Sequence, residues 1–186
     1  QEALDCLKMA FKLNPGDLNS EYSLASIYKD KKDFGAAVAE YKKILNVKED
    51  FLCIYNDLGD IYSQQGKSEE ADQAYKKQID SANRRILSNP NDIAALNDLA
   101  YALNKRGDYE KAKQLIEKAL MAAPDYAQAY FTLAQIQENL KNFKEAERAL
   151  IKYKKLFGNA TFIKESLARV RGEMKSSNPS VSPILS

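Results

Sequence analysis

Apolar residues recur at helical spacings along most of the chain, and the pattern is clearest between Ile93 and Tyr126. One stripe in this stretch consists of Leu96, Leu99, Ala100, Leu103, Ala112, Ile116 and Ala119. It is interrupted once, at Arg106-Gly107-Asp108, and it closes at Ala123-Pro124-Asp125. Spacings of three and four residues are typical of amphipathic helices, and Gly, Asp and Pro mark helix ends. The stretch therefore predicts two short helices joined by a tight turn.

The same unit recurs along the chain with a period of 34 residues. Leu24 and Leu58 are 34 residues apart, as are the successive members of the series Leu99, Leu133 and Leu167, whereas Leu58 and Leu99 are 41 apart. The alanines Ala3, Ala37, Ala71, Ala112 and Ala146 follow the same spacings, with the longer step after Ala71. Both series place seven extra residues between Ala71 and Leu99. A fixed period of this length is the signature of stacked helical hairpins.

The best-formed unit reads Tyr55-x2-Leu58-Gly59-x2-Tyr62, followed by Ala71-x3-Tyr75. It resembles the tetratricopeptide repeat family, whose pattern is an aromatic-x2-Leu-Gly-x2-Tyr helix, then Ala-x3-Phe, then Pro. The resemblance covers almost the whole chain, although Lys141 stands where the family usually has a turn glycine. It implies an all-α fold in which antiparallel helix pairs stack into a right-handed superhelical solenoid.

The period divides the chain into a single expected solenoid over residues 1–175. We expect a half repeat at 1–17, helix pairs at 18–51, 52–92, 93–126 and 127–160, and a capping helix at 161–175. Residues 176–186 are rich in Ser and Pro, so we expect a disordered tail. Since the chain starts inside a second helix, we also expect the N-terminus and any signal sequence to be missing.

The seven extra residues are expected to prolong the second helix of residues 52–92, between about Lys76 and Ser88. Seven residues make two turns, so the buried stripe drifts by only ~20°, and the helix gains about 10 Å. Ile79, Ala82 and Ile86 continue the apolar line, while Arg84 and Arg85 meet water. Two interpretations are open: a tolerated elongation that supports the next repeat, or a ridge that docks a second protein.

Asp and Gly mark the expected helix ends. Asp17, Asp33, Asp92 and Asp108 each precede an expected helix and are predicted N-caps, because their carboxylates can accept orphan backbone N–H groups. The segment from Ile61 to Ser68 ends in Gly-Lys-Ser like a phosphate-binding loop, but it lacks the first glycine and follows a helix rather than a strand. Gly66 is therefore predicted in an interhelical turn.

Composition argues against several classes of function. The 186 residues include no histidine, and the two cysteines, Cys6 and Cys53, form no metal or redox spacing. We therefore expect no catalysis, no metal and no cofactor. A net charge of +2 is too small to indicate nucleic acid by itself, and no run approaches the ~18 apolar residues of a membrane span. Localisation stays open, with the cytoplasm slightly favoured.

The resemblance also implies that the first helices line a concave groove, into which the residues beside each buried leucine project. These residues are Tyr22, Ser26, Asn56, Asp57, Asp60, Asn97, Asp98, Tyr101, Phe131, Thr132 and Gln135. The three aspartates predict a preference for peptides that carry Lys or Arg, since a like-charged tail would be repelled. They also argue against the carboxylate clamp with which one branch of the family binds chaperone tails. Alternatively, the acids only solubilise an empty groove.

The sequence therefore predicts a non-enzymatic scaffold or adaptor that binds a peptide or helix of a partner protein, with a preference for basic sequences. One alternative is a regulatory or targeting arm of a larger enzyme or membrane-associated assembly. Another is self-association through the open N-terminal repeat or the C-terminal tail. Nucleic acid is not an expected partner, because the groove lacks the Lys and Arg lining that phosphate contacts require.

Overall fold

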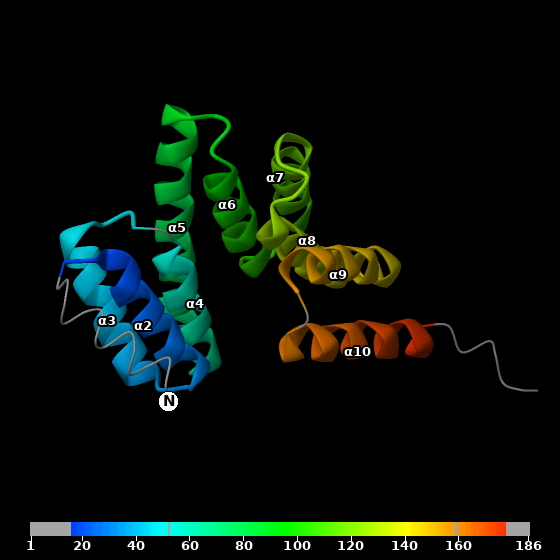
Figure 1. Ribbon diagram of the computed structural model, residues 1–186, viewed down its shortest axis with the longest axis horizontal. Helices are drawn as coiled ribbons and strands as arrows, with labels where there is room; N and C mark the ends of the chain where they lie inside the picture. Colours follow the sequence, from blue (N-terminus) through cyan, green and yellow to red (C-terminus); the bar gives the residue numbers. More distant parts are fainter. Residues whose placement is uncertain (1–15, 52, 159, 178–186) are drawn as a thin grey trace, which may run out of the picture. The chain divides into compact units, whose positions relative to one another are not determined.

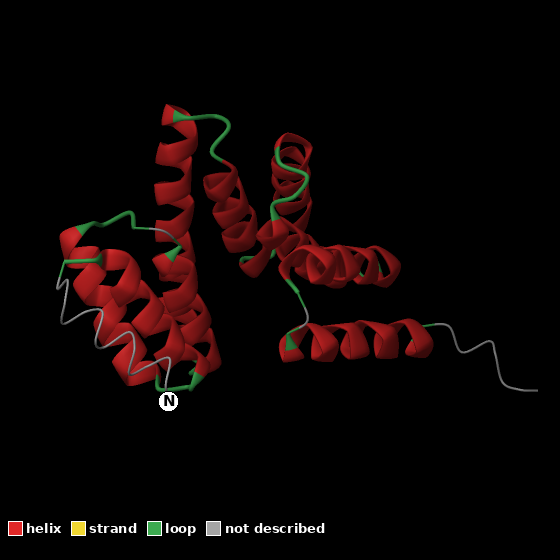
Figure 2. Ribbon diagram, in the orientation of Figure 1, coloured by secondary structure: helices red, strands yellow, loops and turns green. Residues whose placement is uncertain are grey.

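The computed structural model describes residues 16–51, 53–158 and 160–177, and every regular element in these ranges is an α-helix (Figures 1 and 2). The helices are α2 (Leu18–Asp30), α3 (Phe34–Val47), α4 (Ile54–Gln64), α5 (Ser68–Ser88), α6 (Ile93–Lys105), α7 (Tyr109–Ala122), α8 (Ala127–Asn139), α9 (Phe143–Phe157) and α10 (Thr161–Ser176). The expected N-terminal half repeat falls almost wholly on residues 1–15, outside the described ranges. Nearly all of the expected tail lies outside them too.

The chain divides into two compact units, residues 1–81 and 82–186, with the boundary inside α5. Among the described residues, the first unit holds α2, α3, α4 and the first part of α5. The second holds the end of α5 and α6 to α10. The expectation of one continuous solenoid over residues 1–175 stays a prediction.

Within each unit the helices pack as consecutive pairs. Helix α2 packs against α3 in the first unit; in the second, α6 packs against α7, α8 against α9, and α10 against α9. Small side chains occupy the crossings within these pairs and let the helices approach closely. These buried alanines are Ala25, Ala37, Ala100, Ala112, Ala134 and Ala146.

The leucines of the 34-residue series occupy similar environments. Leu24, Leu58, Leu99 and Leu167 are all at most 9% exposed. Leu133 is half-buried and packs against two apolar clusters of the second unit. The recurrence of these leucines in the sequence thus corresponds to a similar place on α2, α4, α6, α8 and α10.

The turns inside the pairs share one backbone feature. Lys32, Gly66, Gly107 and Lys141 have φ values of 61°, 74°, 88° and 62°, and each lies eight residues after the leucine of its pair. Gly66 therefore lies in an interhelical turn, as predicted. Only glycine adopts this left-handed conformation without steric cost, so the two lysines place a strained residue where the pattern favours glycine.

Three of the four predicted N-caps are confirmed. The carboxylates of Asp17, Asp33 and Asp92 accept the backbone N–H groups of Asn19, Ala36 and Ala95 at 2.9–3.2 Å. Asp108 also occupies the N-cap position, in front of α7, but the predicted hydrogen bond is wrong. Its side chain makes no cap hydrogen bond. Instead its Oδ2 lies 3.4 Å from Lys111 Nζ, because the ammonium group one turn away competes for the carboxylate.

Helix α5 is a single helix of 21 residues, whereas the other second helices α3, α7 and α9 have 14, 14 and 15. Its extension keeps Ala82 buried and Ile79 and Ile86 half-buried, while Arg84 is exposed. Arg85 departs from the expectation that it meets water, because it is bound by two aspartates of the second unit.

Candidate functional site

The side chains beside the buried leucine of each first helix form the candidate site, and in the first unit they centre on Asp57. The hydroxyl of Tyr22 on α2 donates to Asp57 Oδ2 on α4 at 2.8 Å. Lys29 of α2 forms an ion pair with the same carboxylate. Cys53 Sγ lies 3.2 Å from the Tyr22 hydroxyl. The side chain of Asp57 is only 9% exposed, so its charge is compensated inside the protein.

Burial controls the protonation of this cluster. Burial raises the pKa of the Asp57 carboxyl, and the neighbouring Lys29 ammonium and Tyr22 hydroxyl only partly offset that rise. Burial, followed by the Asp57 charge, also raises the pKa of Tyr22 well above its ordinary value. Tyr22 therefore remains a neutral hydrogen-bond donor to Asp57.

Asp60 and Ser26 lie near this cluster and bond to tyrosines of the second helices. The Tyr75 hydroxyl of α5 donates to Asp60 Oδ1 at 2.8 Å, and Ser26 Oγ lies 3.2 Å from the Tyr41 hydroxyl. Burial and the Asp60 charge together raise the pKa of Tyr75. Ser26 and Asp60 are both half-buried, so part of each remains open to solvent.

In the second unit the corresponding positions form amide and hydroxyl contacts. Thr132 Oγ1 of α8 donates to Asn97 Oδ1 of α6 at 2.8 Å, and Asn139 Nδ2 donates to Asn104 Oδ1 at 2.9 Å. Each pair is 35 residues apart, as are Tyr22 and Asp57. Tyr22 and Asn97 each lie two residues before a repeat leucine, and their partners each lie one residue before the next. One contact therefore recurs at the same place in both units.

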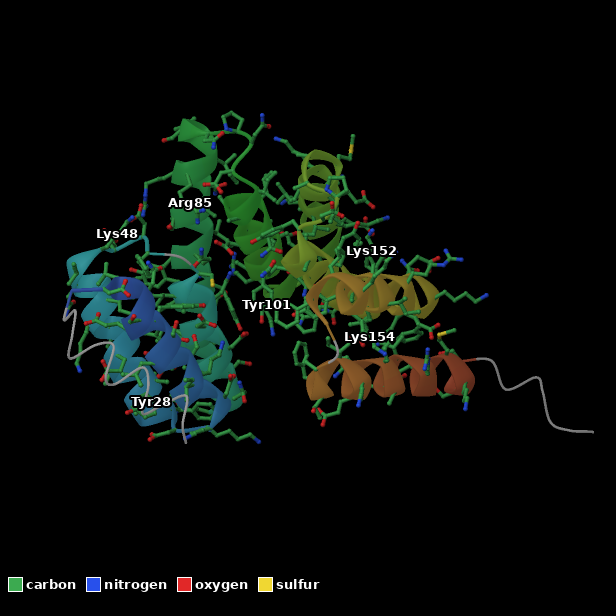
Figure 3. All side chains as sticks on the ribbon, in the orientation of Figure 1. Tyr28, Lys48, Arg85, Tyr101, Lys152 and Lys154 are labelled. Carbon is green, nitrogen blue, oxygen red and sulfur yellow. The ribbon has the colours of Figure 1, made fainter. Side chains whose placement is uncertain are left out.

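Asp98 and Asp92 bind Arg85 from the extension of α5, which is labelled in Figure 3. Arg85 Nε and Nη2 lie 3.1 and 3.0 Å from the two oxygens of Asp92, and Nη1 lies 3.2 Å from Asp98 Oδ2. The planar guanidinium group suits such a two-pronged contact. The Asp98 side chain is 11% exposed, so this carboxylate too is balanced within the chain.

Three predicted site residues of the second unit stay half-buried: Tyr101, Phe131 and Gln135. Lys105 Nζ lies 5.0 Å from the ring centroid of Tyr101, and Tyr101 is labelled on α6 in Figure 3. Phe131 contacts the rings of Tyr153 and Phe162 at centroid distances of 5.3 and 5.6 Å. These side chains are anchored on helices and still present surface to solvent.

The described ranges contain neither a cluster of metal ligands nor a membrane-spanning helix. In residues 16–51, 53–158 and 160–177, no three His, Cys, Asp or Glu side chains gather as metal ligands would. None of the helices described there is both long and apolar enough to cross a bilayer.

Family comparisons agree with the repeated contacts. Family models described as "Tetratricopeptide repeat" match residues 22–51, 50–125 and 103–160. Together these matches cover the chain from residue 22 to residue 160. The chain belongs to the tetratricopeptide repeat (TPR) family.

Solved structures of TPR proteins have the same fold. A thermophilic TPR protein of Thermus thermophilus matches with a TM-score of 0.67 at 18% identity, over 92% of this chain and 88% of that one. PilW, described as a widely conserved type IV pilus biogenesis factor, matches with a TM-score of 0.52 at 17% identity, over 95% and 84%. The comparison with curated proteins gave no match. At these identities the structural likeness shows the fold alone, and it confirms the expected all-α helical-repeat solenoid class.

As a TPR chain, the protein is a protein-interaction repeat module. The structure places Asn56, Asp57, Asn97, Asp98 and Thr132 at less than 10% exposure. The half-buried members of the predicted set are Tyr22, Ser26, Asp60, Tyr101, Phe131 and Gln135. Within each unit the predicted set thus combines buried polar residues with half-buried ones, whose exposed chemistry is aromatic, amide, hydroxyl and, at Asp60, carboxylate.

Sequence reasoning missed the two cations that neutralise the predicted site, Lys29 and Arg85. Lys29 lies seven residues after Tyr22, which is two helical turns, so helical spacing places both on one face of α2. That spacing is a usable signal for Lys29. Arg85 lies in the inserted segment, where the 34-residue register has no equivalent position, and the TPR pattern carries no signal for it.

Proposed function

We propose that this TPR chain is a non-enzymatic scaffold or adaptor that holds a peptide or helix of a partner protein against its first helices. The observation that supports the proposal is the contact repeated between Tyr22 and Asp57 and between Asn97 and Thr132. Such a contact holds two first helices together within each unit, α2 with α4 in the first and α6 with α8 in the second. Side chains next to the contacts therefore start from a preorganised base, which reduces the entropy lost on binding.

The accessible residues have the chemistry of a peptide-binding surface. Tyr101 and Phe131 offer aromatic rings with large contact area, and aromatic side chains are enriched at the centres of protein interfaces. In the first unit Ser26 offers a hydroxyl group that can bond a peptide backbone, and in the second unit Gln135 is half-buried, with its Oε1 inside the protein. We infer that the partner contributes an extended or helical segment with apolar side chains.

The charge preference expected at the first helices is smaller than three unpaired carboxylates would give. Lys29 balances Asp57, and Arg85 balances Asp98. The expected preference for partners with Lys or Arg is kept as part of the proposal, and Asp60 tests it because it is half-buried whereas Asp57 and Asp98 are buried. The variant Asp60→Asn removes the charge but keeps an oxygen that can accept the Tyr75 hydroxyl.

The test compares a groove variant with a control variant in the second unit. The groove variant is Tyr101→Ala with Gln135→Ala, and the control is Lys118→Ala with Met121→Ala on the exposed side of α7. Proteins captured from a native extract are identified by mass spectrometry, and peptides of each are titrated against the three chains by fluorescence anisotropy. We expect the groove variant to bind at least about tenfold more weakly, with unchanged far-ultraviolet circular dichroism.

A partner that binds the groove variant as tightly as the wild type would contradict the proposed site. A partner lost equally from the groove and control variants would do the same. For the charge preference, Asp60→Asn should weaken the binding of a basic partner and reduce its salt dependence, because one attractive charge is removed. If Asp60→Asn changes neither the affinity for a basic partner nor its salt dependence, the proposed preference for basic partners is wrong. This result would not contradict the proposed binding site itself.

A further inference from the structure

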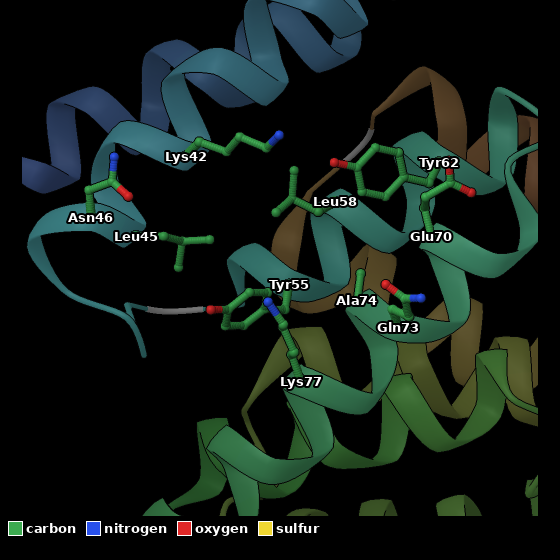
Figure 4. A pocket seen from close by; sticks show the side chains of 10 residues that line it. All are labelled: Lys42, Leu45, Asn46, Tyr55, Leu58, Tyr62, Glu70, Gln73, Ala74 and Lys77. Atoms are coloured by element: carbon green, nitrogen blue, oxygen red, sulfur yellow. The ribbon is translucent and has the colours of Figure 1, made fainter.

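A cleft lies in the first unit, bordered by α3, α4 and α5 (Figure 4). Its volume is about 340 Å³, which lies within the range of ligand-binding clefts. Leu58 and Tyr62 line it from α4, on the opposite side of that helix from the groove residues Asp57 and Asp60, as the period of 3.6 residues requires. The cleft is therefore a surface separate from the one in the proposed function.

The floor of the cleft is apolar. It is formed by Leu45 of α3, Leu58 and Tyr55 of α4, and Ala74 of α5. Leu58, Tyr55 and Ala74 belong to the core of the first unit, whereas Leu45 is half-buried. Leu45 and Tyr62, which also lines the cleft, keep exposed apolar surface, and covering it with another apolar side chain releases hydrating water, which is favourable. The floor thus favours a large apolar side chain of a partner.

The rim of the cleft carries more positive than negative charge. Lys42 reaches it from α3 and Lys77 from α5, on opposite sides in Figure 4, and Glu70 is the only acidic residue of the described lining. In the part of the chain that the structure describes, none of these three residues forms an ion pair. Lys77 Nζ lies 5.5 Å from the ring centroid of Tyr55, a contact that keeps this cation at the mouth of the cleft.

We propose that this cleft docks an acidic segment of a protein partner. In this arrangement a large apolar side chain of the segment covers Leu45 and Leu58, and a neighbouring Asp or Glu lies between Lys42 and Lys77. The amides of Asn46 and Gln73 on the rim bond the backbone of the segment. The groove is proposed to prefer basic partners, so the two surfaces select partners of different charge.

The experiment uses the full chain and a random library of 12-residue peptides. Peptides enriched on the wild-type chain are titrated by fluorescence anisotropy against a cleft variant, Lys42→Glu with Lys77→Glu. The control variant, Lys31→Glu with Lys67→Glu, makes the same charge change at exposed positions of the same unit. We expect a class of peptides in which Leu, Met or Phe adjoins Asp or Glu. These peptides should bind the cleft variant at least tenfold more weakly and the control variant within twofold of the wild type.

Two further variants separate this proposal from the proposed function. Leu45→Ser leaves the charges in place and should weaken the acidic class at least fivefold. The groove variant Tyr101→Ala with Gln135→Ala should leave that class unchanged, so failure of one surface does not imply failure of the other. If the charge-reversed chain loses helicity, two other measurements test the proposal. They are the binding of the acidic peptides to Leu45→Ser and the salt dependence of their binding to the wild type.

Four outcomes would overturn the proposal. The first is that no peptide is enriched, and the second is that the enriched peptides are neutral or basic. The third is that lysine reversal in the cleft has no more effect than reversal at the control positions. The fourth is that a single-stranded oligonucleotide competes with the acidic peptides as well as the peptides compete with one another, which would indicate a general affinity for polyanions.

Discussion

The ring of Tyr75 lies so close to the backbone of Gly59 that a Cβ atom on Gly59 would come within 2.4 Å of the ring carbon Cε1. Tyr75 is 4% exposed, and its hydroxyl donates to Asp60 at 2.8 Å. The ring therefore has neither space nor freedom to move aside. This contact explains why glycine follows Leu58, whereas alanine follows the corresponding leucine in the other helix pairs.

We predict that Gly59→Ala destabilises the protein by about 1–3 kcal/mol, the usual cost of overpacking a core. The new methyl group must displace the Tyr75 ring, which loses its bond to Asp60. Urea denaturation followed by circular dichroism measures the change. The matched control is Gly172→Ala in α10, where a Cβ meets no atom within 4 Å; it should stabilise by up to ~1 kcal/mol through helix propensity. If both variants gain stability, the close contact at Gly59 is wrong.

The turn between α2 and α3 holds Lys32 with φ 61°, where the turn between α4 and α5 has Gly66. A side chain in the left-handed region is strained, and glycine is not. Lys32→Gly should therefore raise the free energy of unfolding by about 0.5–1 kcal/mol, although glycine also adds entropy to the unfolded chain. The reciprocal change Gly66→Ala should lower it by a similar amount, since a Cβ there meets no atom within 4 Å and only the backbone strain acts. Thermal denaturation of both variants measures these changes in stability. Equal shifts in one direction would contradict the strain argument.

Lys29 is predicted to stabilise the fold mainly by compensating the buried carboxylate of Asp57. Lys29→Met should cost about 2 kcal/mol at pH 7, less than the 3–5 kcal/mol of a fully buried broken pair because Lys29 is partly exposed. The double variant Lys29→Met with Asp57→Asn should recover most of this loss. Urea denaturation measures both, and the control is Lys31→Met at the exposed C-cap residue of the same helix.

The stability lost in Lys29→Met should depend on pH, because it depends on the charge of Asp57. The folded-state pKa of Asp57 lies above its ordinary value of 3.8 because of burial, and removing Lys29 raises that pKa further. A raised carboxyl pKa contributes stability that is complete below the ordinary value and is lost as pH rises through the folded value. The deficit of Lys29→Met relative to the wild type should therefore shrink as pH falls from 7 towards 4. A deficit that stays constant or grows on acidification would refute the assignment.

The period of the sequence was sufficient to predict the helix pairs, because it reports which residues are buried together. The repeat pattern places Leu58, Gly59 and Tyr75 in one helix pair, although it does not show how closely Gly59 and Tyr75 approach. The partners of the Asp57 carboxylate could not be predicted from the sequence. The pattern places Asp57 beside the leucine, on the side of α4 that the family resemblance assigns to the groove, but it does not show that Lys29 and Tyr22 of the preceding first helix reach its carboxylate. Contacts between helices depend on the register of one pair against the next, which the repeat pattern does not specify.

The seven-residue insertion likewise predicted the helix but not its side-chain contacts. A seven-residue step predicts an unbroken helix because it preserves the phase of the stripe, and α5 does run from Ser68 to Ser88. The role of Arg85 depends instead on the loop that follows α5, which returns Asp92 to within 3.1 Å of the guanidinium group. Side-chain partners across a loop follow from its conformation, and the repeat pattern contains no information on it.

The centre of α5 carries a buried polar side chain that should oppose folding. Gln78 is fully buried, and across the described residues neither its Oε1 nor its Nε2 has a hydrogen-bond partner. Each unmet amide group costs about 1–3 kcal/mol in desolvation, whereas an unbranched apolar side chain of similar length fits irregular core space. Gln78→Met is therefore expected to raise the free energy of unfolding by about 1–3 kcal/mol.

Urea denaturation of Gln78→Met against Gln114→Met provides the measurement. Gln114 is exposed on α7, so its replacement should change stability by less than about 0.5 kcal/mol. A loss of stability in Gln78→Met would show that a buried water satisfies the amide in solution, since removing a satisfied buried group exposes the cost of its partner. A gain limited to Gln78→Met would show that a polar residue is kept at this point of α5 despite its cost, which would favour a role for Gln78 other than stability.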